Sequence, residues 1–221
     1  MKRMVLAGSA LVALGGCAAG NPYTGVEAGP AAVAEAPAAV VVPATIPVPD
    51  NVLLADWTGP YGGVPPWDRV KITQFPEAPQ FSIEEQRREI AAIADNAEAP
   101  TFDNSIVALE KSGQRLNRVG TIYGLYSNNL SSPEFQAVEK EWDPKLSAAS
   151  DEVTLNPKLF QRIKAVYDSR AGLGLDAKQL RLVEKTYESY VRNGANLEPA
   201  PKEQLAAINQ QLASAFGSFS N

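Results

Sequence analysis

From about residue 79 to the end of the chain, apolar side chains recur at the three- and four-residue spacing of an α-helix. The clearest stripe lies in one segment and comprises Phe135, Val138, Trp142, Leu146, Ala149 and Val153. No segment shows the two-residue alternation of a half-buried strand. The spacing therefore predicts an all-α fold, a bundle of about six antiparallel helices.

Residues that cap helix ends divide this region into segments. The first helix is predicted from Pro79 to Ala97, with Ile83, Ile90 and Ile93 on its apolar face. Helix N-termini are then predicted at Thr101, Ser132 and Asp176, whose side chains can accept hydrogen bonds from backbone amides, and the chain is expected to restart at Asn156 and Pro157. Gly194 is expected to end the fifth helix, and the last helix opens near Pro201.

Three residues inside these helices predict local departures from regular geometry. Pro144 lacks a backbone donor and predicts a kink. Gly113 and Gly120 fall on the apolar stripe of the second helix. They indicate either a neighbouring helix that approaches closely or a local weakening of this one.

The first seventeen residues, MKRMVLAGSALVALGGC, have the pattern of an export signal. The apolar run from Val5 to Leu14 is shorter than the about 20 residues that span a bilayer. Small residues precede Cys17, the only cysteine, in a pattern that resembles the lipobox of bacterial lipoproteins. We therefore expect a signal peptide over residues 1–16 and a lipid on Cys17 that anchors the protein to a membrane. The alternative is an ordinary cleaved signal with an incidental cysteine.

Two further features bear on location and on the start of the domain. Ala18 stands where lipoproteins sorted to the outer membrane usually carry such a residue, so the protein is expected to be outer-membrane anchored or periplasmic. Residues 17–51 are rich in Pro, Ala and Val, and their prolines forbid a continuous helix. This segment is interpreted as a flexible linker that could reach roughly 100 Å when extended, although a folded arm is the alternative. The globular domain is then predicted over residues 52–221.

An aperiodic stretch opens that domain, and its large aromatic residues alternate with Gly and Pro. They are Trp57, Tyr61 and Trp67. Large apolar groups are costly to expose to water, so these side chains are expected to be buried. The functional alternative is a loop that contacts peptides or lines a substrate channel.

The chain contains no histidine, and this absence excludes most hydrolytic sites. Neither a Ser-His-Asp relay nor a His-containing zinc site can be built from these residues alone. Two carboxylate pairs are interpreted as solvated helix surface, Glu84 with Glu85 and Glu139 with Glu141. The formal net charge of −5 and the lack of a basic patch argue against a nucleic-acid partner.

Four segments, taken in order, resemble the amino-terminal region of the thimet oligopeptidase family of zinc metallopeptidases. They are most similar to its bacterial peptidyl-dipeptidase and oligopeptidase A branch. The segments are LLADWTGPYGGVPPWDRVK, APTFDNSIVALEKSGQRLNRV, VEKEWDPKLSAASDEVTLNPKLFQRIKAVYD and LGLDAKQLRLVEKTYESYVRNGANL. The resemblance covers about residues 53–221, and Pro76 and Pro79 depart from the family where its first long helix begins.

The resemblance implies a helical two-lobed enzyme whose channel admits short peptides. It also implies zinc held by a His-Glu-x-x-His helix and a further Glu, a motif that this chain lacks. No catalytic or metal-ligating residue can therefore be assigned here. The implied role of this region is a wall of the substrate channel, and the chain by itself is expected to be inactive.

The last apolar stripe, which ends at Phe219, runs almost to Asn221 without a cap or a polar tail. This ending predicts that the catalytic lobe is missing, and the alternative is a helix that frays at a natural terminus.

A different class of function is also open. The chain could be a complete helical lipoprotein that binds peptides or a partner protein without cleaving them.

Overall fold

The computed structural model describes residues 46–59 and 63–220. Within these residues the fold is all-α, as predicted, and the only β-type pairing is an isolated bridge between Thr58 and Val64. Cys17, the predicted signal peptide, most of the predicted linker and Tyr61 lie outside the described residues. The helices are α1 (Glu77–Ala94), α2 (Ala108–Lys111), α3 (Gln114–Asn129), α4 (Pro133–Thr154), α5 (Pro157–Ser169), α6 (Ala177–Arg192) and α7 (Pro199–Ser220).

Short helical turns supplement these helices. They are 3₁₀ turns at Ile72–Gln74 and Arg170–Gly172 and a π-helical turn at Phe102–Val107. None of the helices in the described part of the chain is long and apolar enough to cross a bilayer.

The predicted capping residues stand at helix N-termini. The Ser132 hydroxyl accepts a hydrogen bond from the Phe135 amide at 3.2 Å. The Asp176 carboxylate accepts one from the Gln179 amide at 2.9 Å, and the Gln179 side chain in turn accepts one from the Asp176 amide. Thr101 and Asn156 cap in the same way. Each contact satisfies an amide that has no partner inside the helix, so local sequence sets these boundaries.

The prediction of one continuous second helix is wrong, because the chain breaks at Ser112–Gly113. Gly113 has a φ of 66°, a conformation that L side chains rarely adopt. Its amide donates to the Glu89 carboxylate at 2.7 Å, and the Gln86 side chain occupies the space that a Cβ would need. At Gly120 the predicted close approach is absent among the described residues, because a Cβ there would meet nothing within 4 Å.

The predicted ends of the first helix also need correction. Helix α1 begins at Glu77 and ends at Ala94, so Ala97 lies beyond it and is exposed. Both Pro76 and Pro79 fit at its start because amides of the first turn have no helical partner. Helix α4 continues through Pro144 without a break.

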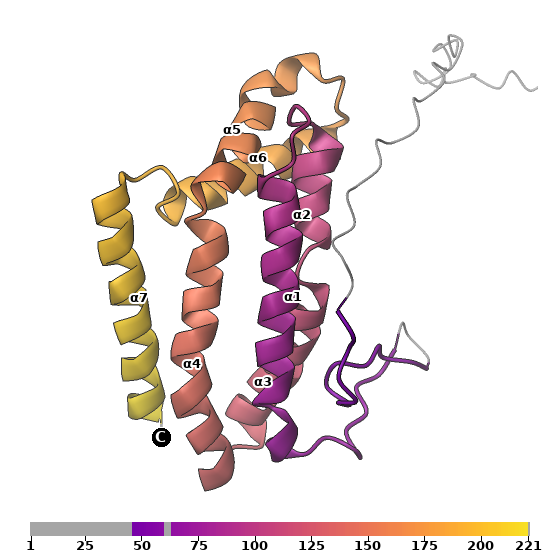
Figure 1. The fold of residues 1–221 in the computed structure, drawn as a ribbon, viewed down its shortest axis with the longest axis vertical. Helices are drawn as coiled ribbons and strands as arrows, with labels where there is room; N and C mark the ends of the chain where they lie inside the picture. The colour runs from indigo at the N-terminus through magenta and orange to yellow at the C-terminus, as the bar shows by residue number, and fades with distance from the viewer. Residues whose placement is uncertain (1–45, 60–62, 221) are drawn as a thin grey trace, which may run out of the picture. The chain divides into compact units, whose positions relative to one another are not determined.

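The first of two core clusters lies among α1, α3 and α4, which stand side by side in Figure 1. Phe75 is fully buried at its centre, and its ring centroid lies 5.0 Å from that of Phe135 and 5.0 Å from that of Tyr126. The other buried members are Leu53, Leu54, Ala78, Ile83, Val119, Ile122, Tyr123, Trp142 and Ala149. This cluster fixes α4 relative to α1 and α3.

The second core cluster joins the end of α1 to α5, α6 and the π-helical turn. Its buried members are Ile90, Ile93, Ile106, Ala108, Leu159, Ile163, Val166 and Val183. Arg162 is buried beside it and donates to the Asn96 carbonyl at 2.8 Å and to the Asn104 side chain at 2.9 Å. Burial lowers the pKa of Arg162 because desolvation disfavours its charged form.

Helix α7 packs against the outer side of α4 (Figure 1). Small or polar residues make much of this contact; Asn209, for example, donates to the Asp151 carboxylate at 2.8 Å. The large apolar side chains of the predicted stripe mostly point away from α4. Ile208 is 58% exposed, Leu212 51%, Phe216 62% and Phe219 90%. The predicted stripe is therefore largely exposed, although Leu205 is partly buried, and Phe216 adds to the apolar outer face of α7.

Candidate functional site

The aromatic loop predicted as a possible contact surface is only partly buried. Trp57 packs against the first core cluster, whereas Trp67 is 41% exposed. Leu53 and Leu54, which precede the loop, are fully buried and hold its start in place. The prediction that the aromatic residues are buried thus holds in part for Trp57, which is partly buried, and is wrong for Trp67, and Tyr61 lies outside the described residues.

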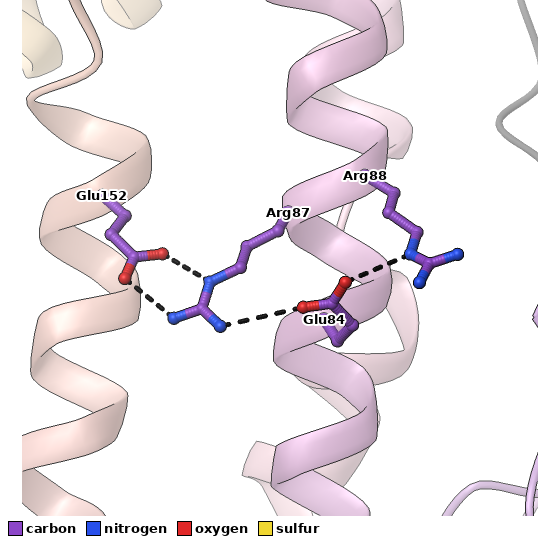
Figure 2. Close-up of polar contacts among 4 residues, drawn as sticks. All are labelled: Glu84, Arg87, Arg88 and Glu152. Atoms are coloured by element: carbon purple, nitrogen blue, oxygen red, sulfur yellow. Dashed lines mark hydrogen bonds and ion pairs between the residues drawn. The ribbon is translucent and has the colours of Figure 1, made fainter.

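The carboxylate Glu84 belongs to a surface network of ion pairs between α1 and α4 (Figure 2). Arg87 binds Glu152 in a bidentate manner, with Nε to Oε2 at 2.6 Å and Nη2 to Oε1 at 2.8 Å. This hydrogen bonding raises the pKa of Arg87. Glu84 also pairs with Arg88 at 3.2 Å. Because these side chains are partly exposed and already paired, the network is a surface contact and not an acid–base site.

The remaining predicted carboxylates differ in their surroundings. Glu85 pairs with Arg115 at 2.8 Å, and Glu141 pairs with Lys145 at 2.7 Å on the exposed side of α4. Glu139 does not fit the prediction of solvated helix surface, because it is only 6% exposed. Among the described residues it has neither a hydrogen-bond nor an ion-pair partner.

Glu139 lines a groove between α4 and α7 with a volume of about 500 Å³. Asp143, one helical turn further along α4, lines the same groove. The Tyr123 hydroxyl from α3 donates to Asp143 Oδ1 at 2.6 Å. Burial, together with this hydrogen bond, raises the pKa of Tyr123 well above its usual range, so the phenol stays protonated. The groove therefore holds two carboxylates one turn apart.

The sequence contains a signal that could have identified Glu139. It lies four residues after Phe135 and three before Trp142, both of which are buried. That spacing places Glu139 on the same side of the helix as the apolar stripe. A charged residue at such a position is a candidate for burial, so its position relative to Phe135 and Trp142 could have identified it.

The described residues do not form a zinc site. They bring together no group of three or more His, Cys, Asp or Glu side chains that could hold a metal ion. The whole sequence lacks histidine, whereas the resemblance described above implies zinc ligands that include two histidines. The donor set therefore does not fit zinc, and no metal-dependent step can be derived from these residues.

Comparison with known proteins identifies relatives. No protein-family model matches the chain. Over 169 residues, 76% of this chain, it is 34% identical to dipeptidyl carboxypeptidase of Escherichia coli (strain K12). The dipeptidyl carboxypeptidase of Salmonella typhimurium (strain LT2) matches with the same identity and coverage. The matched residues span a quarter of the length of each relative. Over this matched region the chain is similar to members of the peptidyl-dipeptidase and oligopeptidase family.

Proposed function

We propose that this chain forms one wall of the substrate channel of an extracytoplasmic zinc metallopeptidase that cleaves short peptides, of the peptidyl-dipeptidase type. The observation that carries the proposal is the 34% identity over 169 residues to two dipeptidyl carboxypeptidases. The four segments that resemble the family are distributed along the helical domain, so the similarity reflects the domain as a whole rather than one short motif.

In this proposal the chemistry belongs to a part of the relatives that has no counterpart here. The chain has no histidine and so cannot supply the His-Glu-x-x-His helix. What it can supply is a rigid surface. The two core clusters hold α1 and α3 to α6 in place, and a fixed wall keeps a peptide oriented toward a reacting centre held elsewhere.

The outer face of α7 supports this division of roles. Ile208, Leu212 and Phe216 are each more than half exposed and lie on one side of the helix. No charged residue follows Glu203 in the sequence, so no like-charge repulsion opposes contact along this face. An apolar patch of this kind is typical of a surface that a neighbouring domain covers. We therefore assign it to contact with the catalytic part.

Attachment to a membrane through Cys17 belongs to the same proposal and has its own test. Cells that express the chain are fed a labelled fatty acid, and label is expected on the wild-type protein but not on a Cys17→Ser variant. An Ala18→Ser variant, which keeps the cysteine, serves as the control that should remain labelled. Equal labelling of the wild type and Cys17→Ser would refute lipid attachment at this residue.

A chimera tests the role as a channel wall. The matched 169 residues of the Escherichia coli enzyme are replaced by those of this chain. The chimera is expected to release dipeptides from a short blocked peptide, and a chelator should abolish this activity. Adding Leu212→Glu and Phe216→Glu should lower the activity, whereas Gln210→Glu and Gln211→Glu on the same helix provide a matched charge control.

Two results would refute the proposal. The first is a folded chimera that binds zinc but does not cleave the peptide. The second is chelator-sensitive cleavage by the isolated chain, because this chain would then itself contain the reacting groups.

The second candidate function is a non-catalytic module that binds peptides or a partner protein. The groove between α4 and α7 favours it, because a groove of about 500 Å³ falls within the range of ligand sites. Sequencing the gene beyond codon 221 separates the two candidates. An open frame that encodes His-Glu-x-x-His supports the peptidase, and a stop codon followed by unrelated sequence supports the binding module.

A further inference from the structure

Glu139 is a mostly buried residue of α4 whose carboxylate lines the groove. It is 6% exposed, and no hydrogen bond or ion pair to its side chain forms within the described residues. An ionised carboxylate beside apolar surface is stabilised when a donor or a positive charge compensates it. Buried polar groups in native proteins are nearly always satisfied. An external group that completes this site would account for its presence.

Asp143 adds a second acceptor with a fixed orientation. Tyr123 donates to its Oδ1 atom at 2.6 Å, so the carboxylate is held in place from the core side. Its other oxygen, Oδ2, lies near Gly217 of α7, where an added Cβ would stand 3.3 Å away. The glycine therefore leaves room beside Oδ2. Glu139 and Asp143 both line the groove, on adjacent turns of α4.

The charges around the groove leave it negative. From α4, the only positive side chain that lines it is Lys140, which is exposed and forms no ion pair within the described residues. From α7, the lining residues are Ala213, Ser214 and Gly217, and none carries a charge. From α3, Tyr123 stays protonated. Within the part of the chain that the structure describes, no positively charged side chain pairs with either carboxylate.

The shape and lining of the groove favour one class of cation. Ala137, Pro144 and Ala213 provide apolar surface beside the carboxylates, which suits an alkyl chain with a charged end. Ammonium and guanidinium groups donate several hydrogen bonds and bind carboxylates strongly. Calcium takes six to eight oxygen ligands, and no group of three metal-ligating side chains exists among the described residues.

We propose that the groove between α4 and α7 binds an alkyl ammonium or alkyl guanidinium group, with Glu139 and Asp143 as its acceptors. The group could belong to a lysine or arginine side chain of a peptide or to a free amine, since the recognised chemistry is the same. The site involves residues of this chain alone, so it does not depend on the proposed peptidase activity.

Calorimetric titration of the full 221-residue chain tests the proposal. The probes are agmatine, a peptide with one internal arginine, the same peptide with citrulline in place of arginine, and calcium chloride. Agmatine, the arginine peptide or both should bind, and the citrulline peptide should bind more weakly. If only the arginine peptide binds, the groove recognises a cationic side chain of a peptide. If agmatine alone binds, the groove recognises a free amine.

Variants test which residues bind the cation. Glu139→Gln and Asp143→Asn should each weaken binding by about tenfold or more, because each removes a charged hydrogen-bond acceptor. Glu141→Gln removes the same charge from the exposed side of α4 and should leave the dissociation constant unchanged. Tyr123→Phe should weaken binding less than Asp143→Asn, because it frees Asp143 without removing it.

A thermal melt of each variant without ligand separates binding from folding. Since Glu139 is unpaired, Glu139→Gln should melt at the wild-type temperature or above it. If Glu139→Gln does not fold, the dissociation constants of Asp143→Asn and Tyr123→Phe are compared with that of wild type instead. The proposal is overturned if neither agmatine nor the arginine peptide binds, or if the citrulline peptide binds as tightly as the arginine peptide. It is also overturned if Glu139→Gln and Asp143→Asn bind as tightly as wild type, or if calcium binds at the site and displaces agmatine.

Discussion

The exposed apolar face of α7 gives the sharpest test of the fold, because its removal should cost little stability. We consider the double substitution Leu212→Ser and Phe216→Ser. Full burial of a leucine or phenylalanine side chain contributes about 1.5–3 kcal/mol. Leu212 is 51% exposed and Phe216 is 62% exposed, so less than half of that contribution is realised at each position. We expect each substitution to lower the free energy of unfolding by about 1 kcal/mol or less.

The same substitutions should change association strongly. Ile208, Leu212, Phe216 and Phe219 form a face that water contacts in the isolated chain. Such a face is expected to make the chain self-associate at high concentration. Sedimentation velocity over a range of concentrations should show wild-type association and a monomeric double variant. Urea unfolding of dilute samples, followed by circular dichroism, measures the stability of both.

A serine substitution of a buried leucine gives the loss of stability with which the α7 double variant is compared. Leu159 is fully buried in the second core cluster, so Leu159→Ser should cost about 3 kcal/mol or more. The reasoning fails if the α7 double variant is destabilised as much as Leu159→Ser, because its side chains would then be buried. It also fails if wild type remains monomeric at every concentration.

Three further predictions concern the core and the polar contacts. Phe75→Ala should lower the free energy of unfolding by about 3–5 kcal/mol, and Phe75→Leu by clearly less, in urea titrations; equal costs would contradict the aromatic packing. A double-mutant cycle of Arg87→Gln and Glu152→Gln should give a coupling of about 1 kcal/mol or less that shrinks with salt, whereas a larger, salt-independent coupling would mean that the pair is buried. The raised pKa of Tyr123 means that the folded state keeps a proton that the unfolded state loses above its ordinary pKa of 10.0. Stability should therefore fall as pH rises above that value, and Tyr123→Phe should make the fall shallower; an unchanged slope would refute the assignment.

Local sequence determined most of the helix boundaries. Thr101, Ser132 and Asp176 were predicted as helix caps, and each side chain accepts a hydrogen bond from an amide of the first turn. The stripe from Phe135 to Trp142 was also predicted, and both residues are buried. These features depend on neighbours a few residues apart in the chain, so one sequence suffices to find them.

Contacts between distant segments decided the break at Gly113. The sequence shows a glycine on a helical stripe, and either a continuous helix or a turn is compatible with that pattern. In the structure Glu89 accepts the Gly113 amide and Gln86 fills the space beside it, and both residues come from α1. A contact across 24 positions of sequence cannot be deduced from the periodicity of either segment.

The sequence by itself predicted a last helix that opens near Pro201 and carries an apolar stripe, but it placed Glu139 on the solvated surface of its helix. Only the tertiary structure decided that the apolar face of α7 points outward and that Glu139 is enclosed. The physical reason is that helical spacing fixes which side chains share a face, because it is a property of one helix. The direction in which that face points is a property of several helices, because it depends on which surfaces bury the most apolar area together.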